Sequence, residues 1–157
     1  MNSDIILKIF RSGWRFKIYT FLKLPSLLFW GVKIKSIEKN RAEILLPFSW
    51  RTQNPFRSIY FSALMGGAEL STGILGLLAL EGKNVSMLVV GASGKFLKKA
   101  DSKVKFICDD GEMIHDVVKE VLNSEEGKTI TVTSKGYNDI GILIGEFEFI
   151  WSFKKRK

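Results

Sequence analysis

The chain has 157 residues, about the size of one ordinary domain, and its 46% hydrophobic content excludes a chain that is disordered throughout. Lysine and arginine number 24 against 16 acidic residues, so the net charge of +8 favours anionic partners without choosing among nucleic acid, anionic lipid and phosphorylated cofactors. The single cysteine, Cys108, excludes a disulfide within the chain and fits a reducing, cytoplasmic location. It falls in an apolar run, where a buried and inert thiol is expected.

The first segment predicts an amphipathic helix over residues 5–22. Apolar residues recur there at helical spacing: Ile5, Ile6, Ile9, Phe10, Trp14, Ile18, Phe21 and Leu22. Lys8, Arg11 and Arg15 lie away from this stripe, and Pro25 ends or bends the segment. The charges are spread among the apolar residues, which argues against a signal peptide. A helix lying on the domain's own surface is the favoured interpretation, and docking on an anionic membrane surface is the alternative.

A hairpin and a long apolar helix are expected next. The runs 31–37 and 41–47 flank a polar triplet and predict two antiparallel strands. Residues 59–80 are apolar enough for a membrane span, but strand-like segments on both sides favour the buried central helix of a soluble domain. Ser58 is the expected N-cap of this helix, and Gly82 is expected to end it.

The second half of the chain predicts further strands and a short helix. The strands are expected at 85–90, 102–108, 128–134 and 140–153, and the helix at 113–122. One long apolar helix and about six strands predict an α+β fold in which an antiparallel sheet wraps the helix. The chain is expected to form a single domain, with an N-terminal helix (1–24) ahead of a core at 31–157.

Residue counts exclude several common mechanisms. His115 is the only histidine, and its neighbours Asp116 and Lys119 predict a solvated surface position. Ser-His and Cys-His nucleophiles and a zinc centre would all depend on that one residue, so no metal site is expected. Residues 91–95 lack the glycine and lysine spacing of a Walker phosphate loop.

Glu69 is the one charged residue in the long apolar helix. A buried carboxylate destabilises a fold unless it is paired, hydrogen-bonded or neutral. Steps of three and four place it on one face with Ser62, Gly66, Gly73 and Gly76. This stripe of small residues leaves space for another backbone or for a ligand. A structural glutamate bonded to a neighbouring strand and a functional carboxylate both remain open at this point.

The segment from Asn54 to Glu69 resembles the signature of hotdog-fold acyl-CoA thioesterases. Asn54 falls on the family's amide position, Phe61 on the backbone oxyanion donor and Glu69 on the catalytic carboxylate, seven and fifteen residues after Asn54. With a one-residue adjustment, Ser86 is similar to a serine or threonine that lines the site from the facing subunit. The element order from Gly31 onward also agrees. The N-terminal helix and the helix at 113–122 are similar to a hotdog branch known only as a domain of unknown function.

The resemblance implies hydrolysis of the thioester of an acyl-CoA or an acyl carrier. The free N–H groups at a helix start would bind the developing oxyanion. Glu69 would attack the carbonyl or deprotonate a water, which Asn54 would orient. Substrate-binding positions are expected at Ser58, Tyr60, Ser62, Gly66, Lys95, Lys98 and Lys99. The lysines would face the phosphates of coenzyme A, which is part of the substrate, and no separate cofactor is implied.

Some departures from the family keep a second function open. Pro55 and Tyr60 stand where histidines are frequent, and Phe61 and Ser62 replace a glycine pair. A backbone N–H survives the loss of glycine, although the Phe61 side chain would narrow the acyl channel. The alternative is a catalytically silent hotdog module that binds acyl chains, acyl-CoA or a protein partner. The family also implies a homodimer or tetramer. Nucleic-acid binding ranks last because no aromatic-basic motif occurs.

Overall fold

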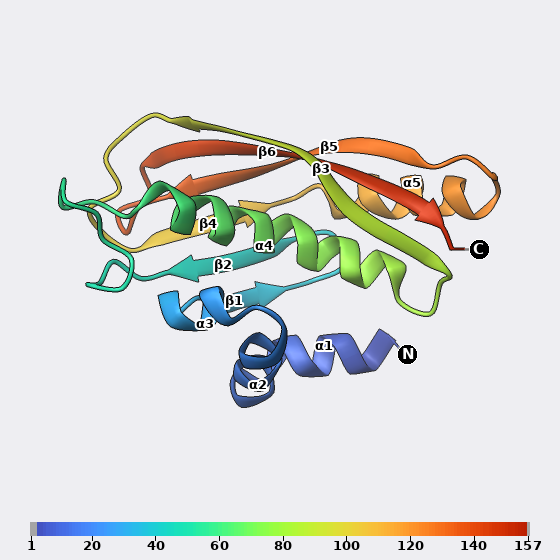
Figure 1. The fold of residues 1–157 in the computed structure, drawn as a ribbon, viewed down its shortest axis with the longest axis horizontal. Coiled ribbons are helices and arrows are strands. Elements are labelled where there is room, and N and C mark those ends of the chain that lie inside the picture. Colours follow the sequence, from blue (N-terminus) through green and yellow to red (C-terminus); the bar gives the residue numbers. More distant parts are fainter. Residues whose placement is uncertain (1–2, 157) are drawn as a thin grey trace.

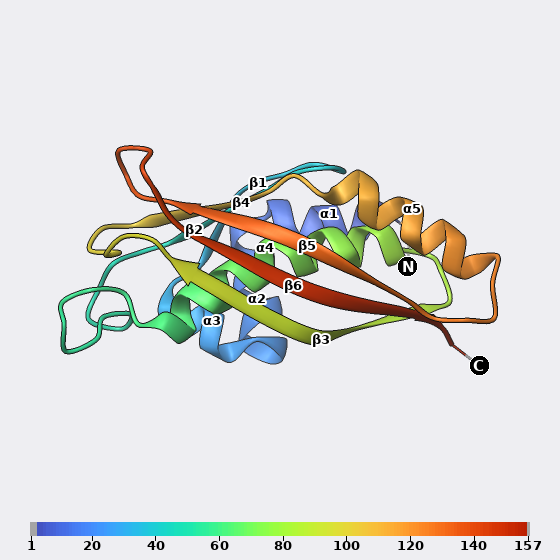
Figure 2. The same cartoon turned by 90° about the horizontal axis from the view of Figure 1, so that it is seen from above.

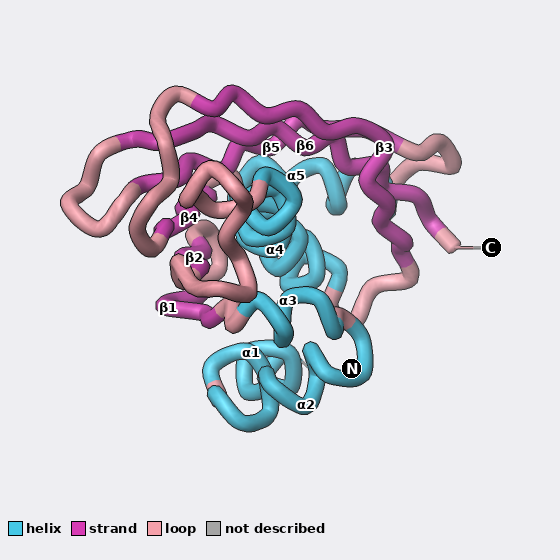
Figure 3. Tube along the Cα trace, turned by 60° about the vertical axis from the view of Figure 1, so that its left-hand side comes forward, coloured by secondary structure: helices cyan, strands magenta, loops and turns pink. Residues whose placement is uncertain are grey.

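In the computed structural model, which describes residues 3–156, one antiparallel sheet curls around a long central helix, α4 (Phe61–Leu80). Figures 1 and 3 show the sheet on one side of this helix, and Figure 2 looks onto the sheet from above. The six strands are β1 (Lys33–Ile37), β2 (Ala42–Leu46), β3 (Val85–Phe96), β4 (Val104–Cys108), β5 (Lys128–Tyr137) and β6 (Leu143–Lys155). Their order is β1-β2-β4-β5-β6-β3, so β1 and β3 are the edges. This confirms the predicted α+β architecture.

The helix α4 is the core of the domain. It is long and apolar enough to cross a membrane, but 67% of its most apolar window is buried inside the protein. Its buried residues, such as Leu70, Ile74 and Leu75, face the inner side of the sheet together with Phe106 and Phe147. The prediction that this helix is buried in the core is therefore confirmed.

The predicted C-terminal end of α4 is confirmed, whereas its predicted N-cap is wrong. Gly82 follows the helix with φ of 70°, a left-handed conformation that suits glycine, so the predicted helix end is confirmed. Ser58 is not the N-cap, because the helix begins after Tyr60, whose backbone is extended and which makes no side-chain capping bond. The Ser58 hydroxyl instead donates to Asn54 Oδ1 at 3.1 Å.

The stripe of small residues on α4 accommodates large side chains. A Cβ atom at Gly66 would lie 2.7 Å from Cζ3 of Trp30, and one at Gly76 would collide with Met87. A Cβ atom at Gly73 would lie 3.3 Å from the Trp151 ring. Of the two alternatives left open for this face, another backbone or a ligand, these contacts do not support the first, because bulky side chains from the surrounding elements lie against the glycines.

The predicted single N-terminal helix is three helices in the structure. The chain leaves α1 (Ser3–Arg11) at Ser12, whose backbone is extended, and resumes as α2 (Gly13–Lys23). Serine and glycine are both weak helix formers, which explains a break between them. Pro25 then opens α3 (Pro25–Trp30) at a position where a missing N–H has no cost. Figure 3 shows the three helices on the side of α4 that faces away from β5 and β6.

The second half of the chain agrees with the sequence apart from its element ends. The short helix is α5 (Gly111–Leu122), which buries Ile114, Val118 and Val121. Strand β3 continues six residues beyond the predicted end at 90, since it pairs with β6 along its whole length. The hairpin of β1 and β2 is present as predicted.

The two residues set aside as chemically inert differ in their surroundings. Cys108 is fully buried, and burial raises the pKa of its thiol to about 12, which confirms an unreactive side chain. His115 is partly buried rather than solvated, and its Nε2 is buried without a hydrogen-bond partner among the described residues. Burial lowers the pKa of His115, and the nearby charges of Lys83 and Lys39 lower it further.

Candidate functional site

Glu69 lies in a small apolar cavity in the middle of α4. The cavity has a volume of about 190 Å³ and is lined by residues of α4, the sheet and the N-terminal helices. Its walls include Phe10, Tyr19, Leu24, Ile74, Met87 and Trp151. Glu69 is the one acidic residue among them, so a carboxylate faces an otherwise apolar space.

The Glu69 carboxylate has an environment that favours its protonated form. Within residues 3–156 its oxygens receive no hydrogen bond, and burial raises its pKa. A Cβ atom at Gly73 would lie 3.1 Å from Oε1, so the carboxylate bends toward the C-terminal part of the helix. The Trp151 indole donates its N–H to Thr72 at 3.0 Å and is engaged elsewhere. Glu69 therefore has no hydrogen-bond partner within residues 3–156. This argues against the interpretation of Glu69 as a structural glutamate bonded to a neighbouring strand.

Tyr19 of α2 is a wall residue of this cavity that the sequence did not single out. Its own burial raises the pKa of the phenol, and the negative charge of Glu69 raises it further. Tyr19 lies outside the apolar stripe predicted for residues 5–22, so helical periodicity gave no reason to choose it. The one feature of the sequence that could have pointed to Tyr19 is that it is an aromatic residue with a polar hydroxyl within this predicted helix.

Five predicted site residues gather in a second hollow at the start of α4. This depression has a volume of about 390 Å³ and is lined by Asn54, Ser58, Phe61, Lys98 and Lys99, together with apolar residues. The loop before α4 contributes Asn54 and Ser58, the first residue of α4 is Phe61, and the loop after β3 contributes the two lysines. The structure thus brings together the expected amide, the helix start and part of the expected phosphate-binding set.

Asn54 uses its side chain to hold the loop that leads into α4. Its Oδ1 accepts hydrogen bonds from the backbone N–H of Phe56 at 3.0 Å, from that of Ser58 at 3.3 Å and from the Ser58 hydroxyl. Its Nδ2 donates to the carbonyl of Ile59 at 3.5 Å. Such bonds stabilise the tight turn at Arg57, whose φ of 57° is left-handed. Asn54 therefore fixes where the helix begins.

The start of α4 presents free backbone donors. The first intrahelical bonds are donated by Ala63 and Leu64 to the carbonyl of Tyr60. The N–H groups of Phe61 and Ser62 precede them and have no helical carbonyl to bond. Within residues 3–156 no side chain caps this end, so both groups are available to an anionic oxygen at the positive end of the helix dipole.

The two hollows remain separate within one chain. Phe61 and Glu69 are eight residues apart, or about 12 Å along a helix axis, and the carboxylate turns away from Phe61. The remaining predicted residues are also dispersed. The Ser86 hydroxyl donates to the carbonyl of Lys154 at 3.0 Å, Lys95 is exposed near the end of β3, and Gly66 packs against Trp30.

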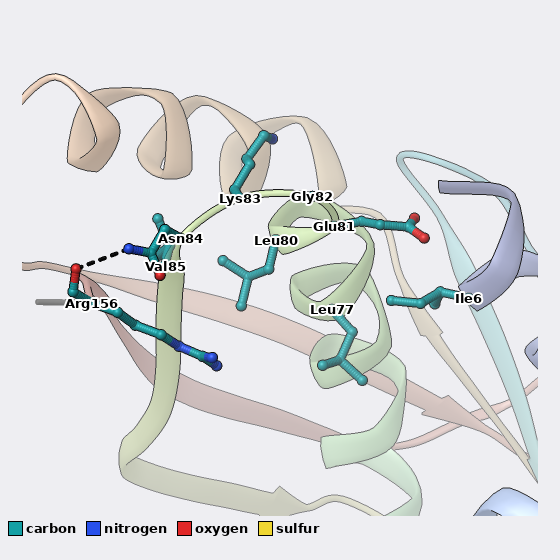
Figure 4. Close-up of a pocket in the computed structure, with 9 residues that line it drawn as sticks. All are labelled: Ile6, Leu77, Leu80, Glu81, Gly82, Lys83, Asn84, Val85 and Arg156. Carbon is teal, nitrogen blue, oxygen red and sulfur yellow. Dashed lines mark hydrogen bonds between the residues drawn. The ribbon is translucent and has the colours of Figure 1, made fainter. Parts of the chain in front are cut away.

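A third hollow lies at the far end of α4. It has a volume of about 470 Å³ and is lined in part by Glu81, Lys83, Asn84 and Arg156. Figure 4 shows Glu81 pointing toward Ile6 of α1 and away from Lys83, while Asn84 bonds to the Arg156 carbonyl at 3.1 Å. Among residues 3–156 no group of histidine, cysteine and acidic side chains is placed to hold a metal ion.

An antiparallel sheet wrapped around one long apolar helix defines the hotdog fold. The chain belongs to the family described as Domain of unknown function (DUF4442), whose profile matches residues 12–151. Among curated proteins, none matches this sequence.

Solved structures support the same fold at low sequence identity. A Pseudomonas aeruginosa protein, PA5026, named Probable Thioesterase, is 16% identical, with a TM-score of 0.79 over 92% of this chain and 97% of its own. The thioesterase HI1161 from Haemophilus influenzae is 15% identical, with a TM-score of 0.68 over 88% of each chain. The protein SAV0944 from Staphylococcus aureus is 15% identical, with a TM-score of 0.65 over 82% of this chain and 97% of its own.

Proposed function

We propose that this protein is a cytoplasmic thioester hydrolase that acts on an acyl-CoA or an acyl carrier. One observation carries the proposal: Glu69 is a carboxylate without a hydrogen-bond partner among the described residues, in an apolar cavity on the central helix. Burial raises its pKa, which is the direction expected of a carboxylate that accepts a proton near neutral pH. The apolar walls suit an acyl chain beside the reacting carbonyl.

The spacing between Asn54 and Glu69 supports the assignment. Fifteen residues separate them. The S. aureus protein SAV0944 was crystallised as a glutamine-to-alanine and as a glutamate-to-alanine variant, and those two positions are also fifteen residues apart. One of the two is described as a thioesterase enzyme. The agreement favours a shared arrangement of amide, helix start and carboxylate.

A homodimer would unite the two hollows. In one chain the donors at Phe61 and the carboxylate of Glu69 are too far apart to contact the same carbonyl. Strand β3 is an unpaired edge, and its exposed apolar residues Leu88, Val90 and Phe96 suit a second copy. Pairing of β3 with its symmetry mate extends the sheet around a two-fold axis. The proposed site then combines Asn54 and Phe61 of one protomer with Glu69 of its partner.

The proposed reaction uses each group for one task. The backbone N–H of Phe61 binds the oxygen of the thioester carbonyl as it becomes negative. Glu69 removes a proton from a water molecule, which adds to the carbonyl carbon, or it attacks that carbon itself and forms a mixed anhydride that water then hydrolyses, releasing the acid and the free carboxylate. The carbon–sulfur bond breaks, and the thiolate of coenzyme A takes up a proton. Lys98 and Lys99 lie beside the helix start, where phosphate groups of the substrate would be held.

A catalytically silent binding module is the second candidate. The exposed rings of Tyr60 and Phe61 pack edge to face at 5.0 Å at the start of α4, and Phe61 lines the helix-start hollow. Asn54 is already engaged within its own loop. An apolar cavity that binds acyl chains without hydrolysis is compatible with both features.

The two candidates differ in one simple assay. The protein is incubated with a panel of acyl-CoAs of increasing chain length and a thiol-reactive dye, which reports free coenzyme A. Enzyme-dependent release that fails in Glu69→Gln supports the hydrolase. Binding of acyl-CoA by calorimetry without release supports the silent module. Light scattering tests the dimer, and a monomer at micromolar concentration contradicts the shared site.

A further inference from the structure

The helix α2 exposes the apolar face that the sequence predicts to be buried. Trp14, Ile18, Phe21 and Leu22 have exposed fractions of 63%, 51%, 68% and 67%. Their spacing of four, three and one residues places them on one side of the helix. The opposite side packs into the protein through Phe16 and Thr20. The stripe is divided at the break at Ser12: Ile6 and Phe10 of α1 are buried, whereas these four residues of α2 are exposed.

The exposed surface continues beyond α2. A groove of about 690 Å³ joins Phe21 of α2 to Phe29 of α3 and is lined by apolar and basic side chains. Phe29 is 52% exposed and packs edge to face on Trp50, which is 73% exposed, at 5.8 Å. We call the set Trp14, Ile18, Phe21, Leu22, Phe29 and Trp50 the outer apolar surface. Exposed apolar residues gathered in this way indicate an interaction site.

The charge around the outer apolar surface has one sign. Residues 5–37 contain no acidic residue and seven basic ones: Lys8, Arg11, Arg15, Lys17, Lys23, Lys33 and Lys35. Lys17, Lys33 and Arg51 line the groove itself, and the Arg15 guanidinium lies 5.2 Å from the Trp14 ring centre. A second copy of this chain would bring the same positive charges together. A partner with negative charges at its surface and an apolar interior complements both features.

We propose that α2 and α3 dock this protein in the interface of an anionic lipid bilayer, with the outer apolar surface among the acyl chains and the basic side chains at the headgroups. Helices that lie in a membrane interface combine large apolar residues on one face with flanking lysine and arginine. Anionic headgroups attract such residues, and exposed tryptophans suit the boundary between water and hydrocarbon.

The docked orientation would place lipid beside the Glu69 cavity. The helix α2 has the outer apolar surface on one side and Tyr19, a wall of that cavity, on another. Phe10 and Leu24 of the same helical layer also line the cavity. Docking itself does not depend on hydrolysis, so it is tested without any assay of activity.

The test uses the full-length protein and vesicles of phosphatidylcholine, with and without about a third of phosphatidylglycerol. We expect the protein to sediment with the anionic vesicles at low salt, to dissociate as salt rises, and to show a blue shift in tryptophan emission when bound. Absence of binding to the anionic vesicles, or equal binding to both kinds, overturns the proposal.

Matched variants locate the surface. Phe21→Glu with Leu22→Glu should lower vesicle binding by about tenfold or more, because both side chains leave the hydrocarbon. Ile140→Glu, at a 76% exposed residue in the β5–β6 loop, is the control and should bind like the wild type. Lys17→Glu with Lys23→Glu removes attraction without touching the apolar face and should also abolish binding at physiological salt. Vesicle binding that survives both double variants overturns the proposal, as does a dimer that dissociates into monomers in Phe21→Glu with Leu22→Glu.

Discussion

The cavity around Glu69 and the hollow at the start of α4 hold the two halves of the proposed chemistry in opposite environments. Glu69 lies among apolar walls with no hydrogen-bond partner in the described chain. In a partly exposed loop, Asn54 Oδ1 accepts hydrogen bonds from the backbone N–H and the hydroxyl of Ser58. The apolar cavity raises the pKa of the Glu69 carboxyl group. The hydrogen-bonded loop positions the backbone N–H donors at the start of α4. Each half can therefore be tested by a different measurement.

The largest effect is expected from Glu69→Gln. The amide keeps the shape of the side chain but cannot accept a proton or attack a carbonyl, so hydrolysis of acyl-CoA should fall by about a thousandfold or more. The melting temperature at neutral pH should stay the same or rise, because an uncompensated charge leaves the apolar cavity. Stopped assays with the thiol-reactive dye and thermal melts measure the two effects.

Glu112→Gln is the control for this variant, since Glu112 is an exposed carboxylate on α5. It should change neither quantity. A Glu69→Gln protein that is less stable than the wild type yet hydrolyses its best substrate at the original rate would sink the proposed mechanism and leave the fold intact.

Substitutions of Asn54 should separate positioning from direct contact. Asn54→Ala removes the acceptor for three hydrogen bonds and should lower the free energy of unfolding by about 1–2 kcal/mol. We expect hydrolysis to drop by about tenfold as well, because the start of α4 shifts. Asn54→Asp keeps the acceptor oxygen and should retain both stability and most of the activity. An Asn54→Asp protein with full stability and no activity would show that the amide N–H contacts the substrate or the attacking water.

The raised pKa of Glu69 predicts a pH dependence of stability with a defined sign. Between the ordinary carboxyl pKa and the raised pKa, the folded protein binds more protons at this site than the unfolded chain does. Stability should therefore fall as pH rises through this window, and the loss should be complete above the raised pKa. The difference in unfolding free energy between Glu69→Gln and the wild type should shrink as the solution is acidified. Denaturant titrations across the acidic range measure it, and a difference that is constant with pH contradicts the assignment.

The smallest effect is expected at the helix-start hollow. Lys98→Ala with Lys99→Ala should raise the KM for acyl-CoA by about three- to tenfold with little change in kcat, because exposed charge pairs contribute weakly. The wild-type KM should rise with salt, and the double variant should respond less. Lys39→Ala, at an exposed position between β1 and β2, is the control. A KM that is independent of both lysines and salt removes these residues from the substrate site.

The sequence by itself determined the buried role of α4, the hairpin of β1 and β2 and the helix α5. These elements follow from local hydrophobic periodicity and from glycine at a helix end, which act between neighbouring residues. It also singled out Glu69, since a lone charge in an apolar helix is visible without any structure. The stretch from Asn54 to Phe61 was found through its resemblance to a family, and the structure places both residues in one hollow.

Only the tertiary structure decided what surrounds these residues. Periodicity assigned one face to residues 5–22, but whether that face is buried depends on which surface remains after α1 and α3 have packed against the core. Tyr19 became a wall of the Glu69 cavity for the same reason, because three helices fold back over α4 from a distant part of the chain. Ser58 failed as a cap because the helix begins only after Tyr60, two residues further along the chain. Burial and hydrogen-bond partners are properties of residues that meet in space, and a pattern read along the chain contains only their spacing.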